Sequence, residues 1–131
     1  MTTNETKNSP FGDVIYQYTR AQAIEDGMLI DVTETATEAG ITMPTAVTAA
    51  VWERCVAVPE KAECQDEMGR LWDALTMLRF AAIRNRGASQ VNFTVAVRND
   101  ARRPWPVQLK AICGPGDSGE PVITVLMPDE D

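Results

Sequence analysis

Three β-like segments follow the longest helical pattern of this chain without interruption, and this order constrains the fold more than any other feature. Residues 91–97 alternate apolar with polar or small side chains, and Val107–Cys113 and Val122–Met127 also have strand composition. Before them, Gln65–Arg86 has apolar residues at helical spacing. The sequence therefore predicts an α+β fold: a single domain whose antiparallel sheet has helices packed on one face. The apolar stripe expected to face the core comprises Met68, Leu71, Trp72, Leu75, Leu78, Ala82 and Ile83.

The first half of the chain predicts shorter elements separated by glycine and proline. Thr19 and Gln22 have the spacing of a capping box, in which the threonine caps a helix and the glutamine reaches back. Gly27 and Gly40 are suited to the left-handed conformation that ends helices, and Pro44 suits the first position of another. We expect a strand at 14–18, a helix from 19 to about 27, a strand at 28–32, a helix from about 34 to 40 and a helix from 44 to 59.

Length and composition are those of a soluble single domain. The chain has 131 residues, of which 44% are hydrophobic and 24% charged. Residues 1–10 are polar and are expected to be flexible, which leaves 11–131 as the domain. Neither an apolar run of about 18 residues nor a signal-peptide pattern is found, so we expect a cytoplasmic protein without a membrane partner. The three cysteines, Cys55, Cys64 and Cys113, are expected to be reduced there.

Several chemistries are disfavoured by the residues themselves. The chain contains no histidine, the commonest general base and transition-metal ligand, and its cysteine spacings match no metal pattern. We therefore expect no catalytic residue, no metal and no cofactor. Gly116–Gly119 reads Gly-Asp-Ser-Gly and resembles the nucleophile motif of chymotrypsin-like proteases, but that mechanism requires a histidine, so we interpret the segment as a turn.

Charge is distributed unevenly along the chain, whose net charge is -7. Residues 1–67 hold 12 acidic and 4 basic residues, whereas residues 68–110 hold 2 acidic and 8 basic residues. A net negative charge disfavours direct binding to nucleic acid or an anionic membrane. It suits a protein partner with a basic surface, such as one that handles nucleic acid, or it simply maintains solubility.

A candidate binding segment lies between the first two strands of the C-terminal group. Arg102, Arg103 and Trp105 place cations and a large aromatic side chain on a predicted hairpin loop, and such residues are enriched among binding hot spots. Alternatively, Trp105 folds back on the sheet edge and the arginines are merely solvated. Asp117 and Glu120, in the loop before the last predicted strand, complete the candidate binding set.

An N-terminal stretch resembles the opening of ADP-ribosyltransferase-like domains. Residues 16–19 read Tyr-Gln-Tyr-Thr and are followed by Ala23-Ile24 and by Gly27-Met28-Leu29. This order resembles the strand, helix and Gly-Leu turn that open domains of that superfamily. Gln17 stands where the motif has its histidine. The resemblance implies, as the alternative function, a nucleotide-binding enzyme or its degenerate descendant. Its pocket would use Tyr16, Arg20 and Glu120.

Over residues 11–131 the chain resembles an uncharacterised bacterial family of small proteins carried on conjugative plasmids and integrative elements. The matching segments are 11–16, 18–24, 49–52, 69–73, 114–117 and 119–124, together with the acidic end. This resemblance implies no catalytic residue, and it implies a setting in which such elements blunt restriction or CRISPR defence. We therefore expect a non-enzymatic accessory protein that binds another protein, of an anti-restriction or anti-CRISPR type.

Overall fold

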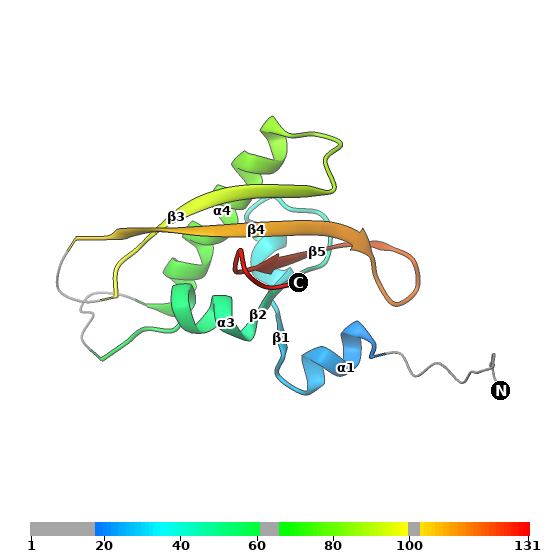
Figure 1. Ribbon diagram of the computed structural model, residues 1–131, viewed down its shortest axis with the longest axis horizontal. Coiled ribbons are helices and arrows are strands. Elements are labelled where there is room, and N and C mark those ends of the chain that lie inside the picture. The colour runs from blue at the N-terminus through cyan, green and yellow to red at the C-terminus, as the bar shows by residue number, and fades with distance from the viewer. Residues whose placement is uncertain (1–17, 61–65, 100–102) are drawn as a thin grey trace.

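The computed structural model describes residues 18–60, 66–99 and 103–131, which build one five-stranded sheet with helices packed against it (Figure 1). The elements are α1 (Arg20–Glu25), β1 (Leu29–Asp31), α2 (Thr33–Glu38), β2 (Thr45–Thr48), α3 (Ala49–Val51), the π-helix η1 (Trp52–Val56), α4 (Glu67–Arg84), β3 (Gln90–Val97), β4 (Trp105–Pro115) and β5 (Pro121–Leu126). The strand order is β1-β2-β5-β4-β3. All neighbouring pairs are antiparallel except β2 and β5, which run parallel. The predicted α+β fold is confirmed.

The long helix α4 lies across one face of the sheet and covers the core (Figure 1). It begins after Asp66, whose carboxylate accepts a hydrogen bond from the backbone N–H of Gly69 at 2.6 Å. Such a cap satisfies one of the free N–H groups of the first turn. Residues of α4 that are buried against the sheet include Leu71, Ala74, Leu75, Leu78 and Ala81, which belong to one cluster with Phe93, Val95, Leu109 and Val125.

Three of the seven residues in the predicted apolar stripe on α4 do not face the core. Met68, Trp72 and Ile83 are exposed, and so is Phe80. These side chains project from the side of the helix turned away from the sheet, because one sheet face can cover only part of the circumference of a helix. The apolar stripe predicted on α4 is therefore buried only in part.

The local signals of the first half are borne out around α1. The Thr19 hydroxyl accepts a hydrogen bond from the backbone N–H of Gln22 at 3.0 Å, and the Thr19 N–H donates to the Gln22 side chain at 2.8 Å. Gly27 and Gly40 follow α1 and α2 with φ of +80° and +96°, the left-handed region that favours glycine. The predicted capping box and both helix ends are confirmed.

The predicted helix from Pro44 was wrong for its first turn. Thr45–Thr48 form β2, which pairs with β1 on one side and β5 on the other, and all four residues are buried. Three of the four are β-branched, and a strand between two partners buries such side chains on both faces. Helical structure begins only at Ala49, where the Thr48 hydroxyl accepts a hydrogen bond from the Val51 N–H at 3.2 Å.

After α3 the chain widens into the π-helix η1, and buried Arg70 of α4 is anchored there. Its Nε donates to the carbonyl oxygen of Cys55 at 3.1 Å. The guanidinium also donates from Nη1 to the Arg98 carbonyl at 2.6 Å and from Nη2 to Asn99 Oδ1 at 2.7 Å. The Asn99 amide in turn donates to the Arg54 carbonyl at 3.3 Å. One side chain therefore joins η1, α4 and the end of β3.

Some predictions concern residues outside the described ranges, namely the flexible segment 1–10, strand residues 14–17 and Cys64. Of the other cysteines, Cys55 is buried and Cys113 is half-buried, and both are free thiols. No helix in the described part of the chain is long and apolar enough to cross a membrane.

Candidate functional site

Trp105 is the first residue of strand β4, whereas the sequence had predicted that it lies in a loop. It pairs with Val97 of β3. Side chains alternate along a strand, so Trp105 shares the face of Val107 and Leu109, which are buried under the helices. Trp105 itself lies at the end of that face and is 63% exposed. It therefore presents a large aromatic surface from a backbone position fixed by strand pairing.

The other predicted residues of this segment are separated from one another. Arg103 is exposed two residues before Trp105, whereas Arg102 lies outside the described residues. Asp117 and Glu120 follow the opposite end of β4. An 11-residue strand spans roughly 34 Å at about 3.4 Å per residue. The four predicted binding residues that the structure describes therefore do not form one site.

Asp117 caps helix α1. Its carboxylate accepts hydrogen bonds from the backbone N–H of Arg20 at 2.8 Å and of Ala21 at 3.0 Å. These two bonds are the main reason that the pKa of Asp117 is lowered from its ordinary value, with a smaller contribution from the nearby Arg20 charge. Asp117 thus joins the loop after β4 to a helix almost one hundred residues earlier in the sequence.

Glu120 holds the turn that carries Asp117. Its carboxylate accepts a hydrogen bond from the Ser118 N–H at 2.9 Å, and its backbone carbonyl accepts one from the Gly116 N–H at 2.6 Å. Gly119 has a φ of +86° within this turn. The interpretation of the Gly-Asp-Ser-Gly segment as a turn agrees with these contacts.

Arg20 lies beside the same loop, in a cavity of about 540 Å³ whose lining includes Tyr18, Gly116 and Asp117. Its guanidinium donates to Thr124 Oγ1 at 2.6 Å and to the Ile123 carbonyl at 2.8 Å. Burial lowers the pKa of Arg20, while the carboxylates of Asp31, Asp117 and Glu120 act in the opposite direction. One cation faces three anions, so the surroundings favour cations over the phosphates of a nucleotide. Tyr16, the third residue of the alternative pocket, lies outside the described residues.

Replacing Asp117 by asparagine is expected to make stability less dependent on pH. Because the folded-state pKa is lowered, the carboxylate stabilises the fold fully above the ordinary aspartate pKa of about 4 and loses this effect as the pH falls through the lower folded value. The difference in melting temperature between wild type and Asp117→Asn should therefore be larger at pH 7 than near pH 2. Asp129→Asn, at an exposed position, is the matched control. Equal differences at both pH values would contradict the capping role.

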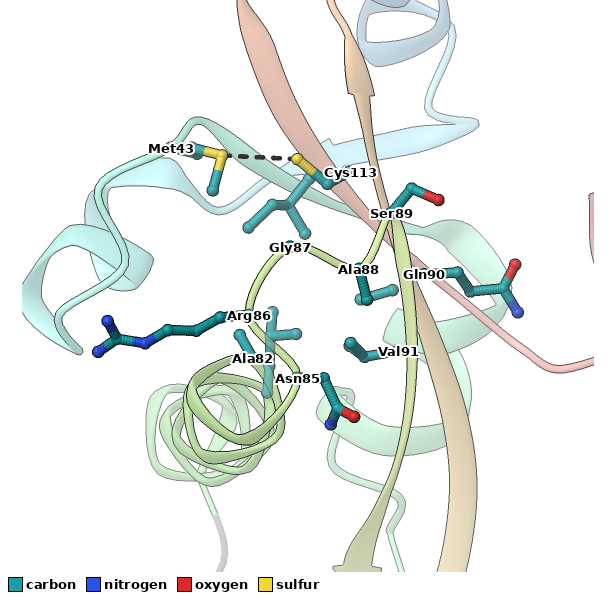
Figure 2. Close-up of a pocket in the computed structure, with 13 residues that line it drawn as sticks. Met43, Ala82, Asn85, Arg86, Gly87, Ala88, Ser89, Gln90, Val91 and Cys113 are labelled. Atoms are coloured by element: carbon teal, nitrogen blue, oxygen red, sulfur yellow. Dashed lines mark hydrogen bonds between the residues drawn. The ribbon is translucent and has the colours of Figure 1, made fainter.

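Sequence reasoning missed a second cavity, which lies between the C-terminal end of α4 and the sheet (Figure 2). Its volume is about 500 Å³, and its lining is mainly apolar. Cys113 and Met43 contribute their sulfur atoms, which lie 3.7 Å apart. The signal that could have indicated this cavity is the run of small residues after α4, because glycine and alanine leave space against the sheet. The lining residues are Met43, Leu78, Ala82, Asn85, Arg86, Gly87, Ala88, Ser89, Gln90, Val91, Ala111, Cys113 and Ile123.

Comparison with known proteins identifies one family. The model of a family of unknown function, DUF6573, matches residues 8–131. No curated protein and no solved structure matches the chain. In the described part of the chain, no group of three acidic or cysteine side chains is arranged to hold a metal ion.

Proposed function

The chain therefore belongs to DUF6573, and we propose that it acts without catalysis, by binding a protein partner that has a basic surface. The observation that carries this proposal is the exposure of Trp105 at the end of the sheet, with the exposed Arg103 two residues before it in the sequence. The proposed setting is the cytoplasm of a bacterium that holds a plasmid or integrative element. The proposed partner is a restriction or CRISPR component whose basic surface handles nucleic acid.

The position of Trp105 favours a binding role over a packing role. A tryptophan that served only the core would bury most of its ring, whereas this side chain is 63% exposed. Its backbone is held by pairing with Val97, so little backbone ordering would be needed on binding. Fixed, exposed tryptophan with an adjacent arginine is a combination enriched among residues that dominate binding energy.

The acidic side chains at the β1 side of the sheet support a basic partner. Five carboxylates on α1, β1 and α2 or their ends are exposed, and opposite charges of this kind raise association rates and exclude wrong partners. We call these residues the acidic edge: Glu25, Asp26, Asp31, Glu34 and Glu38. The acidic edge would steer the complex, and Trp105 would anchor it.

Replacing Trp105 by alanine is expected to weaken capture of the partner at least 10-fold without lowering the melting temperature by more than about 2 °C. The measurement is affinity capture from nuclease-treated host lysate, quantified by mass spectrometry. Met28→Ala is the matched control, because Met28 is also an exposed apolar residue, at 60%, but lies between α1 and β1.

Three outcomes of this experiment are informative. Loss of one stoichiometric partner with Trp105→Ala but not with Met28→Ala supports the proposal. An unchanged partner with both variants overturns the anchoring role of Trp105. If Trp105→Ala unfolds the protein, Trp105→Tyr is measured instead, because tyrosine retains a large aromatic ring. If this variant folds but does not bind the partner, Trp105 contacts the partner and does not serve packing alone.

A further inference from the structure

Helix α4 carries exposed apolar side chains on the side away from the core. The four large ones are between 43% and 57% exposed, and Thr76 lies midway between them. We call this surface the outer stripe: Met68, Trp72, Phe80 and Ile83. Exposed apolar side chains scattered singly are ordinary, but four large ones on the same side of one helix are of the kind that marks an interface.

The spacing of the outer stripe shows that it is one continuous face. Met68, Trp72, Thr76 and Phe80 recur every fourth residue, which places each above the last along a helix. The helix has 18 residues and is about 27 Å long at 1.5 Å per residue. The face is therefore long enough to pair with another helix.

Charge along α4 and its two ends changes sign at the middle of the stripe. The first half and its cap are acidic, and the second half and its end are basic. Arg70 also belongs to the first half, but its guanidinium is hydrogen-bonded inside the fold. Around the outer stripe, the acidic residues are Asp66 and Asp73 and the basic residues are Arg79 and Arg84. Glu67 lies on the other side of the helix, and Arg86 lines the cavity between α4 and the sheet.

This pattern makes the face complementary to itself. When two such helices lie antiparallel, the acidic half of each meets the basic half of the other, and their macrodipoles also run in opposite directions. A parallel arrangement would place like charges together. A two-fold axis near Thr76 would bring Trp72 of one copy towards the partner's Phe80, and Met68 towards the partner's Ile83.

We infer that the outer stripe is the contact between two copies of this chain, which pair antiparallel through α4 about a two-fold axis near Thr76. An isologous contact of this kind uses the same surface twice and closes as a dimer. One helix face per copy is a small interface, so the dissociation constant is on the order of 10 µM. This contact is separate from Trp105, and the proposed partner binding does not depend on it.

Sedimentation velocity between about 1 and 300 µM tests the association. The wild type is expected to reach twice its 14.4 kDa mass, and Thr76→Arg should weaken the dimer at least 10-fold because two arginines would meet at the axis. Thr94→Arg is the matched control, since it adds the same charge at an exposed position of β3. A wild type that stays monomeric, or a dimer that Thr76→Arg leaves unchanged, overturns the inference.

Cysteine cross-linking tests the orientation. In a Cys64→Ser, Cys113→Ser background, Met68→Cys and Ile83→Cys proteins are mixed and oxidised. The antiparallel contact predicts mainly the mixed disulfide between positions 68 and 83. Predominant disulfides between two copies of the same variant would indicate parallel helices and overturn the proposed arrangement. Circular dichroism of each variant shows whether it is folded.

Discussion

Replacing Arg70 by leucine is expected to lower the free energy of unfolding by about 3 to 5 kcal/mol. Leucine has no donor, so the Cys55 and Arg98 carbonyls and the Asn99 side chain would each lose a hydrogen bond that Arg70 now supplies. Arg70 is only 6% exposed and its bond to the Cys55 carbonyl is buried, so water cannot readily replace that donor. Chemical denaturation monitored by tryptophan fluorescence measures the change.

The Arg70→Lys variant distinguishes the contribution of the positive charge from that of the guanidinium geometry. Arg70→Lys keeps the positive charge but lacks the planar group that reaches three acceptors at once, so we expect an intermediate loss of about 2 kcal/mol. Arg84→Leu is the matched control because Arg84 is exposed at the end of the same helix, and it should change stability by less than about 0.5 kcal/mol. If Arg70→Leu also stayed within 1 kcal/mol of wild type, the guanidinium would not be the group that joins η1 to β3.

The second large effect is expected in the core, where two leucines of the same helix should respond differently. Leu75 and Leu78 are each 1% exposed, but Leu78 borders the cavity of Figure 2. We expect Leu75→Ala to cost about 3 to 5 kcal/mol and Leu78→Ala about 2 to 3 kcal/mol. The first creates a new cavity, whereas the second enlarges a cavity that is already present.

The same denaturation measurement tests this pair. Trp72→Ala, on the exposed side of α4, provides the control for loss of a large side chain outside the core and should cost less than about 1 kcal/mol in the monomer. If both leucine variants lost the same free energy of unfolding, or if Leu78→Ala lost more, the cavity beside Leu78 would not reduce the cost of replacing this residue.

Elements with strong local signals were predictable from the sequence. The capping box at Thr19, the glycines at 27 and 40 and the long periodicity of α4 each act within a few residues, and each was found where expected. The prediction of a helix from Pro44 was wrong because the conformation of Thr45–Thr48 depends on pairing with strands elsewhere in the sequence. Its apolar spacing fits a helix, but its pairing with β1 and β5 is visible only in three dimensions.

The candidate sites show the same limit. Trp105 and Asp117 were identified by residue type and grouped in one candidate set, although the strand predicted between them at Val107–Cys113 already separates them; in the structure this strand has 11 residues. The role of Asp117 as the cap of α1 depends on a contact between distant segments. The amphipathic pattern of α4 likewise cannot distinguish apolar residues that face the core from those that face outward, such as Phe80.

The central position of β5 has a consequence for synthesis of the protein. β5 lies between β2 and β4, so a nascent chain that ends before Pro121 has no strand to connect its early elements to its β3–β4 hairpin. β2 must then keep one pairing edge unfilled until β5 has been made, because Thr45 pairs with Ile123. Folding of the sheet is therefore expected to be completed only once β5 has left the ribosome, and in a chain stalled before β5 the β1–β2 pair would have no strand to join it to the β3–β4 pair.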